Sequence, residues 1–223
     1  QIMLGADVVI IGAGIIGVSA ALDIKERNPR QRVMILERDL VPAGASSRNA
    51  GFACVGSASE IYHDIQLLGV DAALDIIEQR WIGLQRLRQR VGDAALGLEQ
   101  HGAHEVFVDH HPVLEALEDV NVLLRPLFNA TFVTRADEAI QRHGFGRAVA
   151  MIYTPFEGTI DSGRMMQALW GMAAAKGVEL RTGCDVQAIE GNRIVVRTPT
   201  SERTIEAGQI IVATNAWPVI VDG

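Results

Sequence analysis

The chain of 223 residues contains few cysteines and no excess of basic residues. Cys54 and Cys184 are its two cysteines and they form no C-x-x-C motif, which indicates reduced thiols in a cytoplasmic protein. Asp and Glu number 27 against 20 Lys and Arg, giving a net charge of −7, so we expect no nucleic-acid surface. No apolar run reaches the roughly 20 residues of a membrane-crossing helix, so we expect no transmembrane segment. We also expect no signal peptide, because residues 1–5 before the first predicted strand are too few for one.

Apolar residues are plentiful instead, at 48% of the chain, while charged residues make up 21%. Such a composition can bury a substantial core, and the length suits one large domain or two small ones. We find no internal repeat and no low-complexity segment in the sequence. These observations indicate an ordinary globular fold.

The most specific motif lies near the N-terminus. Gly12, Gly14 and Gly17 form a G-x-G-x-x-G pattern directly after the apolar run 8–11, and Glu37 closes the next apolar run. Strand, glycine turn, helix, strand and acid in this spacing are typical of a site for an ADP-containing dinucleotide. A glycine-rich turn without a ligand is the competing interpretation.

Each residue of this motif has a physical role in the dinucleotide interpretation. Gly12 allows the tight turn, Gly14 lets the backbone approach a pyrophosphate, and Gly17 lets helix and strand pack closely. The helix N-terminus offers free N–H groups and partial positive charge to the phosphates. Glu37 is expected to accept hydrogen bonds from the ribose hydroxyls of the adenosine.

Hydrophobic periodicity and turn residues predict an α/β fold, with a Rossmann-like parallel sheet, a β meander and an inserted lobe. Predicted helices run from the fingerprint to about residue 27 and over 71–91, 112–124 and 163–176. Predicted strands cover 8–11, 32–36, 105–109, 178–181, 185–190, 193–197, 204–206 and 209–213. Segment 126–158 is expected to be irregular.

Four places in the chain carry a resemblance to a known family. They are the fingerprint with Glu37, the small-residue loop 44–52, the helix entry 158–165, and the segment 210–217, in which Asn215 replaces a commoner glycine. In this order they resemble the N-terminal portion of the FAD-dependent D-amino-acid oxidase superfamily. That superfamily includes glycine oxidase, sarcosine oxidase, D-amino-acid dehydrogenase and gamma-glutamylputrescine oxidoreductase.

The resemblance implies that FAD is the cofactor and assigns residues to its parts, without naming a catalytic residue. The pyrophosphate would be faced by Gly12, Gly14, Ile15 and Ile16. The adenosine would be contacted by Glu37, Arg38 and the backbone of Val186. The phosphates and ribityl chain would be followed by Ala45, Ser46 and Ser47. The isoalloxazine would be approached by Ala50, Gly51 and Phe52. The cofactor would also be lined by Ala213 and Thr214.

Several residues have a structural alternative. Ser46 and Ser47 could cap a helix, Phe52 could lie in the core, and Trp217 is expected to pack rather than to stack on a flavin. Packing also explains an apolar helix face formed by Met165, Met166, Leu169, Trp170 and Met172. The clustered histidines, which are His101, His104, His110 and His111, lack partners for a tetrahedral set, so we expect no metal. Glu157 and His143 are polar residues of the inserted lobe, but neither is favoured as a substrate contact.

The resemblance implies an enzyme that oxidises the C–N bond of an amino acid or related amine by hydride transfer to flavin N5. Its partner would then be a small-molecule amine. The alternatives are an FAD-dependent 2-hydroxy-acid or glycerol-phosphate dehydrogenase, or a truncated, non-catalytic FAD-binding fragment. Residues 1–94 and 159–223 would form the FAD-binding domain, and residues 95–158 part of the substrate domain. We expect that a C-terminal portion of the enzyme, with most of the substrate contacts, is missing from this sequence. Whether the protein forms a homo-oligomer is left open by the sequence.

Overall fold

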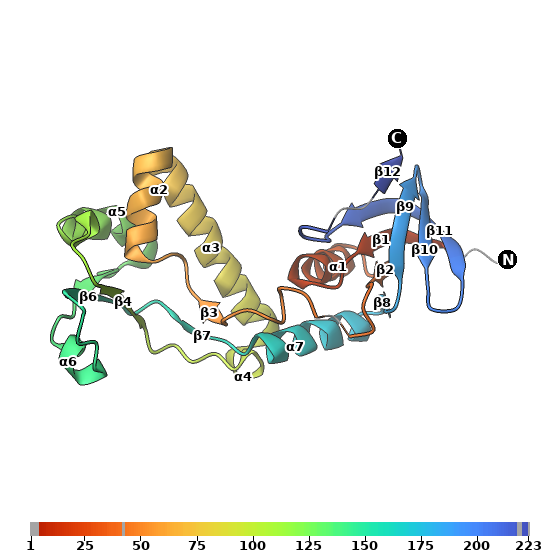
Figure 1. The fold of residues 1–223 in the computed structure, drawn as a ribbon. Coiled ribbons are helices and arrows are strands. Elements are labelled where there is room, and N and C mark those ends of the chain that lie inside the picture. The colour runs from red at the N-terminus through yellow and green to blue at the C-terminus, as the bar shows by residue number, and fades with distance from the viewer. Residues whose placement is uncertain (1–4, 42, 218–219, 223) are drawn as a thin grey trace. The chain divides into compact units, whose positions relative to one another are not determined.

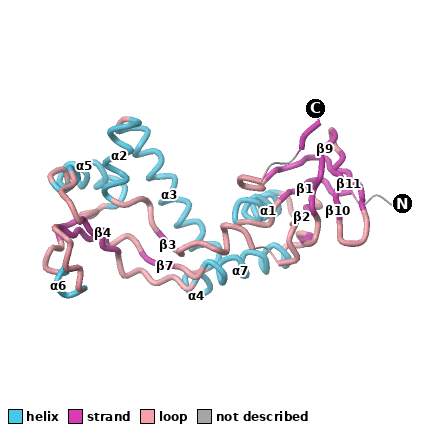
Figure 2. The backbone as a smooth tube through the Cα atoms, in the orientation of Figure 1, coloured by secondary structure: helices cyan, strands magenta, loops and turns pink. Residues whose placement is uncertain are grey.

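The computed structural model describes residues 5–41, 43–217 and 220–222, and Figure 1 and Figure 2 show its helices and strands. Its contacts divide the chain into two compact units. The first unit comprises residues 1–50 and 162–223, and the second unit comprises residues 51–161.

The first unit is built on a seven-stranded mixed sheet with the order β12-β9-β10-β11-β1-β2-β8. Its strands are β1 (Gly5–Ile11), β2 (Val33–Leu36), β8 (Glu179–Arg181), β9 (Asp185–Glu190), β10 (Arg193–Arg197), β11 (Glu202–Val212) and β12 (Ile220–Asp222). Strands β11, β1, β2 and β8 pair in parallel, whereas β9, β10 and β11 form an antiparallel meander. The predicted α/β fold with a parallel sheet and a β meander is therefore confirmed.

The apolar run of β1 is buried on both faces of the sheet. Val9 and Ile11 share a buried cluster with residues of the meander such as Ile194. Ile10 faces helix α1 (Ile15–Arg27), because its Cγ2 lies 3.2 Å from the place that a Cβ on Gly17 would take. Helix α7 (Ser162–Ala175) packs against α1. Burial on both faces explains why the parallel strands read as continuous apolar runs in the sequence.

Strand β11 corrects one detail of the sequence analysis. The predicted strands 204–206 and 209–213 form one strand of 11 residues. Its first half pairs antiparallel with β10 through residues 202–206, and its second half pairs parallel with β1 through residues 206–212. The polar and small residues at 206–208 interrupt the apolar pattern but not the pairing, because backbone partners are available along the whole segment.

The second unit combines helices with two small sheets, β3-β7 and β4-β6-β5. Its strands are β3 (Phe52–Ala53), β4 (Ala103–Phe107), β5 (Thr134–Arg135), β6 (Ala150–Thr154) and β7 (Gly158–Thr159). Its helices are α2 (Ala58–Leu68), α3 (Val70–Val91), α4 (Asp93–Leu96), the 3₁₀ helix η1 (Pro112–Leu114), α5 (Leu117–Phe128) and α6 (Ala139–His143). Helix α3 confirms the amphipathic helix predicted over 71–91.

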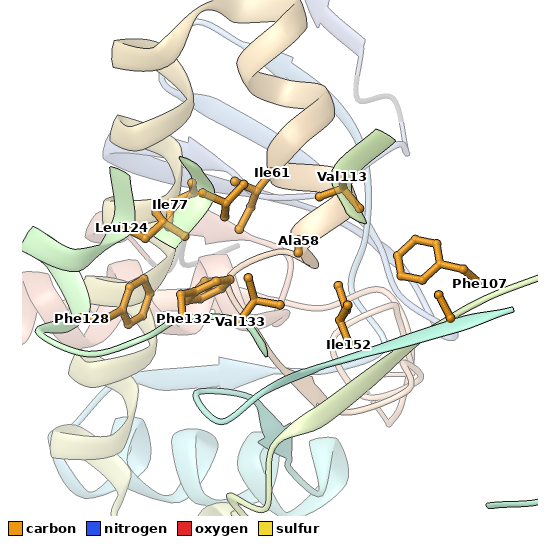
Figure 3. Packing of buried hydrophobic residues seen from close by; sticks show 13 residues of the cluster. Ala58, Ile61, Ile77, Phe107, Val113, Leu124, Phe128, Phe132, Val133 and Ile152 are labelled. Carbon is orange, nitrogen blue, oxygen red and sulfur yellow. The ribbon is translucent and has the colours of Figure 1, made fainter. Parts of the chain in front are cut away.

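The core of the second unit joins α2 and α3 to β6, as Figure 3 shows. Ile61 of α2 and Ile77 of α3 lie in one buried cluster with Leu124 of α5 and Ile152 of β6. Residues 51–94 thus pack in the second unit, whereas the sequence analysis grouped them with the first. An amphipathic pattern shows that one helix face is buried but does not show which unit covers it. The assignment of cofactor and substrate binding to these parts stays a prediction.

Two expectations for the secondary structure of the second unit were wrong. Segment 126–158 is not irregular, because it contains β5, α6 and β6. The helix predicted from Pro112 to residue 124 is a short 3₁₀ turn followed by α5, which continues through Pro126 to Phe128. Helix α2 was not predicted at all.

Asn121 of α5 holds the chain that follows this helix. Its side chain is buried, and its Oδ1 accepts hydrogen bonds from the N–H groups of Phe132 and Val133, each at 2.9 Å. Its Nδ2 donates to the Val133 carbonyl at 2.9 Å. One amide side chain therefore satisfies three backbone groups next to the aromatic core.

We predict that Asn121→Ala destabilises the second unit by about 2–3 kcal/mol, because it leaves buried donors and an acceptor without partners. The free energy of unfolding from urea denaturation measures this change. Val122→Ala on the same helix is the control, since Val122 is 56% exposed and its truncation should cost no more than about 0.5 kcal/mol. Equal losses in the two variants would contradict the role of Asn121.

Candidate functional site

A cavity of about 790 Å³ lies in the first unit, next to the carboxyl ends of β1, β2 and β11. This is where ligands bind in open parallel sheets, and the volume is in the usual range of ligand pockets. Most of the predicted cofactor-binding residues line it, and these are Gly12, Gly14, Ile15, Ile16, Glu37, Arg38, Ala45, Ser46, Ser47, Val186, Ala213 and Thr214. The sheet thus brings together segments that are far apart in the sequence.

The first and last glycines of the fingerprint are required by close backbone contacts. Gly12 has a φ of +106°, and a Cβ there would lie 2.5 Å from the carbonyl oxygen of Ala213. A Cβ on Gly17 would overlap the carbonyl oxygen of Gly12. The turn between β1 and α1 is therefore pressed against the end of β11 on one side and against α1 on the other.

Glu37 supports this turn in the structure. Its Oε2 accepts a hydrogen bond from the N–H of Ala13 at 2.9 Å, and its Oε1 accepts one from the N–H of Asp39 at 3.1 Å. An ionised carboxylate has about four acceptor sites, so capacity remains for ribose hydroxyls. The predicted ribose contact stays a prediction, and the support of Ala13 was not foreseen.

Ser46 caps helix α1 from a distant loop. The N-cap residue Gly14 has no side chain, and the N–H of Ile15 donates instead to Ser46 Oγ at 2.9 Å. The capping alternative for Ser46 is thus realised, on a helix that precedes it in the chain. Because a hydroxyl both donates and accepts, Ser46 can hold this N–H and also donate to a phosphate. Ser47 Oγ donates to the Gly44 carbonyl at 3.3 Å.

Two tryptophans line the pocket in ways that the sequence analysis missed. Trp170, expected on an apolar helix face, donates its Nε1–H to the carbonyl oxygen of Ala13 at 2.9 Å. Trp217, expected to serve packing, is 62% exposed, and its ring centroid lies 4.4 Å from the guanidinium carbon of Arg38. This distance is typical of a cation–π contact. No local sequence signal identifies either partner.

Three predicted residues are not among those that line the pocket, namely Ala50, Gly51 and Phe52. Ala50 ends the first part of the first unit, and Gly51 and Phe52 begin the second unit. The alternative that Phe52 belongs to the core is wrong, because it is 71% exposed. The predicted contact of these residues with the isoalloxazine stays a prediction.

The second unit contains an acidic group around Glu157. Burial, together with the nearby carboxylates of Glu105 and Glu60, raises the pKa of Glu157 to about 7. Glu105 accepts hydrogen bonds from the backbone and hydroxyl of Ser59, and Glu60 forms an ion pair with Arg80 at 3.0 Å. The side chain of Glu157 thus lies among groups that already have partners.

His104 of the second unit lies next to two other rings. His104 lies 5.2 Å from His143 and 5.0 Å from Tyr153 between ring centroids. Burial and the neighbouring His143 lower the pKa of His104. Among residues 5–41, 43–217 and 220–222, no three His, Cys, Asp or Glu side chains are grouped as metal ligands.

The pocket of the first unit fits a dinucleotide by its chemistry. The N-terminus of α1 has no side-chain cap from its own segment, and its backbone N–H groups and partial positive charge suit an anionic pyrophosphate. An acid closes the neighbouring strand, and the cavity is large enough for a ligand of drug size. The arrangement can therefore bind and orient a nucleotide.

Comparisons with known proteins agree with this geometry. A family model described as FAD dependent oxidoreductase, DAO, matches residues 7–222. The bifunctional protein ThiO/ThiG of Synechocystis sp. is 24% identical over 219 residues, which are 95% of this chain and 30% of that protein. Glycine oxidase from Geobacillus kaustophilus has a TM-score of 0.65 at 24% identity, covering 96% of this chain and 56% of its own. L-amino acid deaminase from Proteus myxofaciens has a TM-score of 0.66 at 21% identity, covering 97% and 47%.

The chain thus spans about half the length of these two solved structures and less than a third of the curated relative. At these identities the solved structures establish the shared fold. None of the helices in the described ranges has the length and apolarity needed to cross a membrane.

We predict that Gly17→Ala destabilises the first unit by more than about 2 kcal/mol, because the added methyl group would overlap the Gly12 carbonyl. Gly171→Ala is the matched control. Gly171 lies in helix α7, and a Cβ there would meet no atom within 4 Å. This control should be neutral or stabilising by up to about 1 kcal/mol. Thermal unfolding compares the variants, and a Gly17→Ala protein as stable as Gly171→Ala would refute the close contact.

We also predict that stability depends on pH through Glu157. The folded state keeps the Glu157 proton up to a pKa of about 7, whereas the ordinary value is 4.5. Since the folded state binds more protons in this window, stability falls as the pH rises from about 4.5 to about 7. Glu157→Gln should flatten this fall and unfold at a higher temperature than the wild type above pH 7.

Melting temperatures between pH 4 and pH 8 test this dependence, with Glu118→Gln as the control because Glu118 is exposed on α5. Identical pH profiles for the wild type and Glu157→Gln would show that the Glu157 carboxyl is not perturbed.

Proposed function

The chain belongs to the family of FAD-dependent oxidoreductases, and on this premise we propose that its first unit binds the ADP half of FAD in the pocket at the end of β1. We further propose that the whole protein oxidises the C–N bond of an amino acid or a related amine. The observation that carries the proposal is the turn from Gly12 to Gly17, held between β1, β11 and α1 and open to the pocket.

Different residues of the pocket would contact different parts of the cofactor. The N-terminus of α1 at Gly14 and Ile15 would receive the pyrophosphate, with the Ser46 hydroxyl donating to a phosphate oxygen. Glu37 would accept from the ribose hydroxyls with the lone pairs that Ala13 and Asp39 leave free.

The adenine end of the pocket would be formed by a different set of residues. Arg38 and Trp217 lie against each other at the pocket wall, and Val186 is on the strand β9 nearby. A flat cation–π pair offers a planar surface on which an aromatic base can stack. We propose that the adenine lies next to this pair, with the backbone of Val186 at its edge.

Bound FAD would supply a hydride acceptor at its N5 position. The protein then has to bind the amine, orient its carbon and exclude water. Ala50, Gly51 and Phe52 would face the isoalloxazine, as the resemblance implies. The amine assignment is supported by the family and by the similarity to the structures of glycine oxidase and L-amino acid deaminase.

The proposal is tested by adding FAD to the purified protein and recording the visible flavin spectrum under anaerobic conditions. Glycine, L-proline and other amines should bleach the bound flavin, whereas lactate and glycerol 3-phosphate should not. Bleaching by lactate or glycerol 3-phosphate alone would contradict the amine activity and support the alternative, a 2-hydroxy-acid or glycerol-phosphate dehydrogenase. A bound flavin that no compound bleaches would identify the chain as a non-catalytic FAD-binding module. No binding of FAD would overturn the site itself.

A further inference from the structure

Trp170 contacts the dinucleotide turn from a helix that lies far along the chain. Helix α7 packs against α1, and the indole of Trp170 reaches the pocket wall between them. Its Nε1–H donates to the carbonyl oxygen of Ala13 at 2.9 Å. Ala13 is completely buried, so this oxygen needs a partner from the protein.

The hydrogen bond acts on one peptide group in particular. The carbonyl of Ala13 and the N–H of Gly14 belong to the same planar, trans peptide unit, so they point in opposite directions. A donor that fixes the direction of the carbonyl therefore also fixes the direction of the Gly14 N–H. The preceding peptide is fixed as well, because the Ala13 N–H donates to Glu37 at 2.9 Å.

Fixing the orientation of this peptide matters because the residue that follows Ala13 is a glycine. Gly14 has no Cβ, so rotation of the Ala13–Gly14 peptide meets little steric resistance. A rotated peptide would turn a carbonyl oxygen toward the place where an N–H is needed, and an oxygen repels an anionic phosphate. The Trp170 indole holds the peptide in the orientation seen in the structure.

We propose that Trp170 is a positioning residue for FAD, which holds the Ala13–Gly14 peptide so that its N–H rather than its carbonyl is presented to the pyrophosphate. The inference rests on the proposed FAD site in the first unit. In this proposal Trp170 takes no direct part in the chemistry. It also explains why a large polar aromatic residue occupies an otherwise apolar helix face beside Met166 and Leu169, which are fully buried.

The test removes the indole donor in two ways. Trp170→Phe deletes the N–H and part of the ring, and replacement of Trp170 by 3-benzothienylalanine deletes the N–H while keeping the shape of the ring. Trp81→Phe is the matched control, because Trp81 packs on Phe128 and Phe156 in the second unit. For each protein we would measure the Kd of FAD by fluorescence and the hydrogen exchange of the amides of residues 12–16 without FAD.

Both Trp170 variants should bind FAD about tenfold more weakly than the wild type, since a buried carbonyl loses its partner. Their amides at residues 12–16 should exchange faster in the free protein, and Trp81→Phe should change neither quantity. Should Trp170→Phe fold poorly, the isosteric variant decides. Unchanged FAD affinity in the isosteric variant, even with a lower unfolding midpoint, would reduce Trp170 to a structural residue and overturn the proposal.

The two proposals fail in different ways. If the wild type does not bind FAD, the proposed site is wrong, and so is a role for Trp170 in FAD binding. If the wild type binds FAD while the exchange of residues 12–16 is the same with and without the indole donor, the site stands and the role of Trp170 is overturned.

Discussion

The first unit depends on one constraint, which is that the backbone N–H and carbonyl groups of a buried turn must find hydrogen-bond partners. The turn between β1 and α1 has no side chains of its own that could serve its N–H and carbonyl groups, because small residues are required there. Partners come from elsewhere, with Glu37 and Ser46 accepting from N–H groups and Trp170 donating to a carbonyl. An unpaired buried group would cost about 1–3 kcal/mol, so each partner contributes to a single turn geometry.

The sheet topology brings these partners to one place. Strand β11 pairs with the meander in its first half and with β1 in its second half, so its end at Ala213 lies against Gly12. Helix α7 returns beside α1 and places its indole at the same turn. The proposed binding of a pyrophosphate through backbone groups of this pocket therefore depends on residues distributed over the whole unit. This arrangement also explains why the pocket is lined from six separate segments of the chain.

Much of the first unit could be predicted from the sequence because its signals are local. The fingerprint, the acid at Glu37 and the hairpin between residues 185–190 and 193–197 each follow from spacing and turn residues, and β9 and β10 have these bounds. The hydrogen-bond partners of Trp170 and Ser46 could not be predicted, because they lie 157 and 31 positions away in the chain. The second unit was predicted less well. Packing of α2 and α3 on Leu124 and Ile152 is decided by tertiary contacts, and no local pattern specifies it.

The central claim is that the pocket of the first unit recognises the ADP half of FAD through this buried turn. Competition against bound FAD tests it most directly, with ADP and FMN added separately in excess and the released FAD measured after dialysis. The account predicts that ADP displaces FAD and that FMN does not, since the proposed contacts would be made to the pyrophosphate, ribose and adenine. Displacement by FMN without displacement by ADP would contradict it.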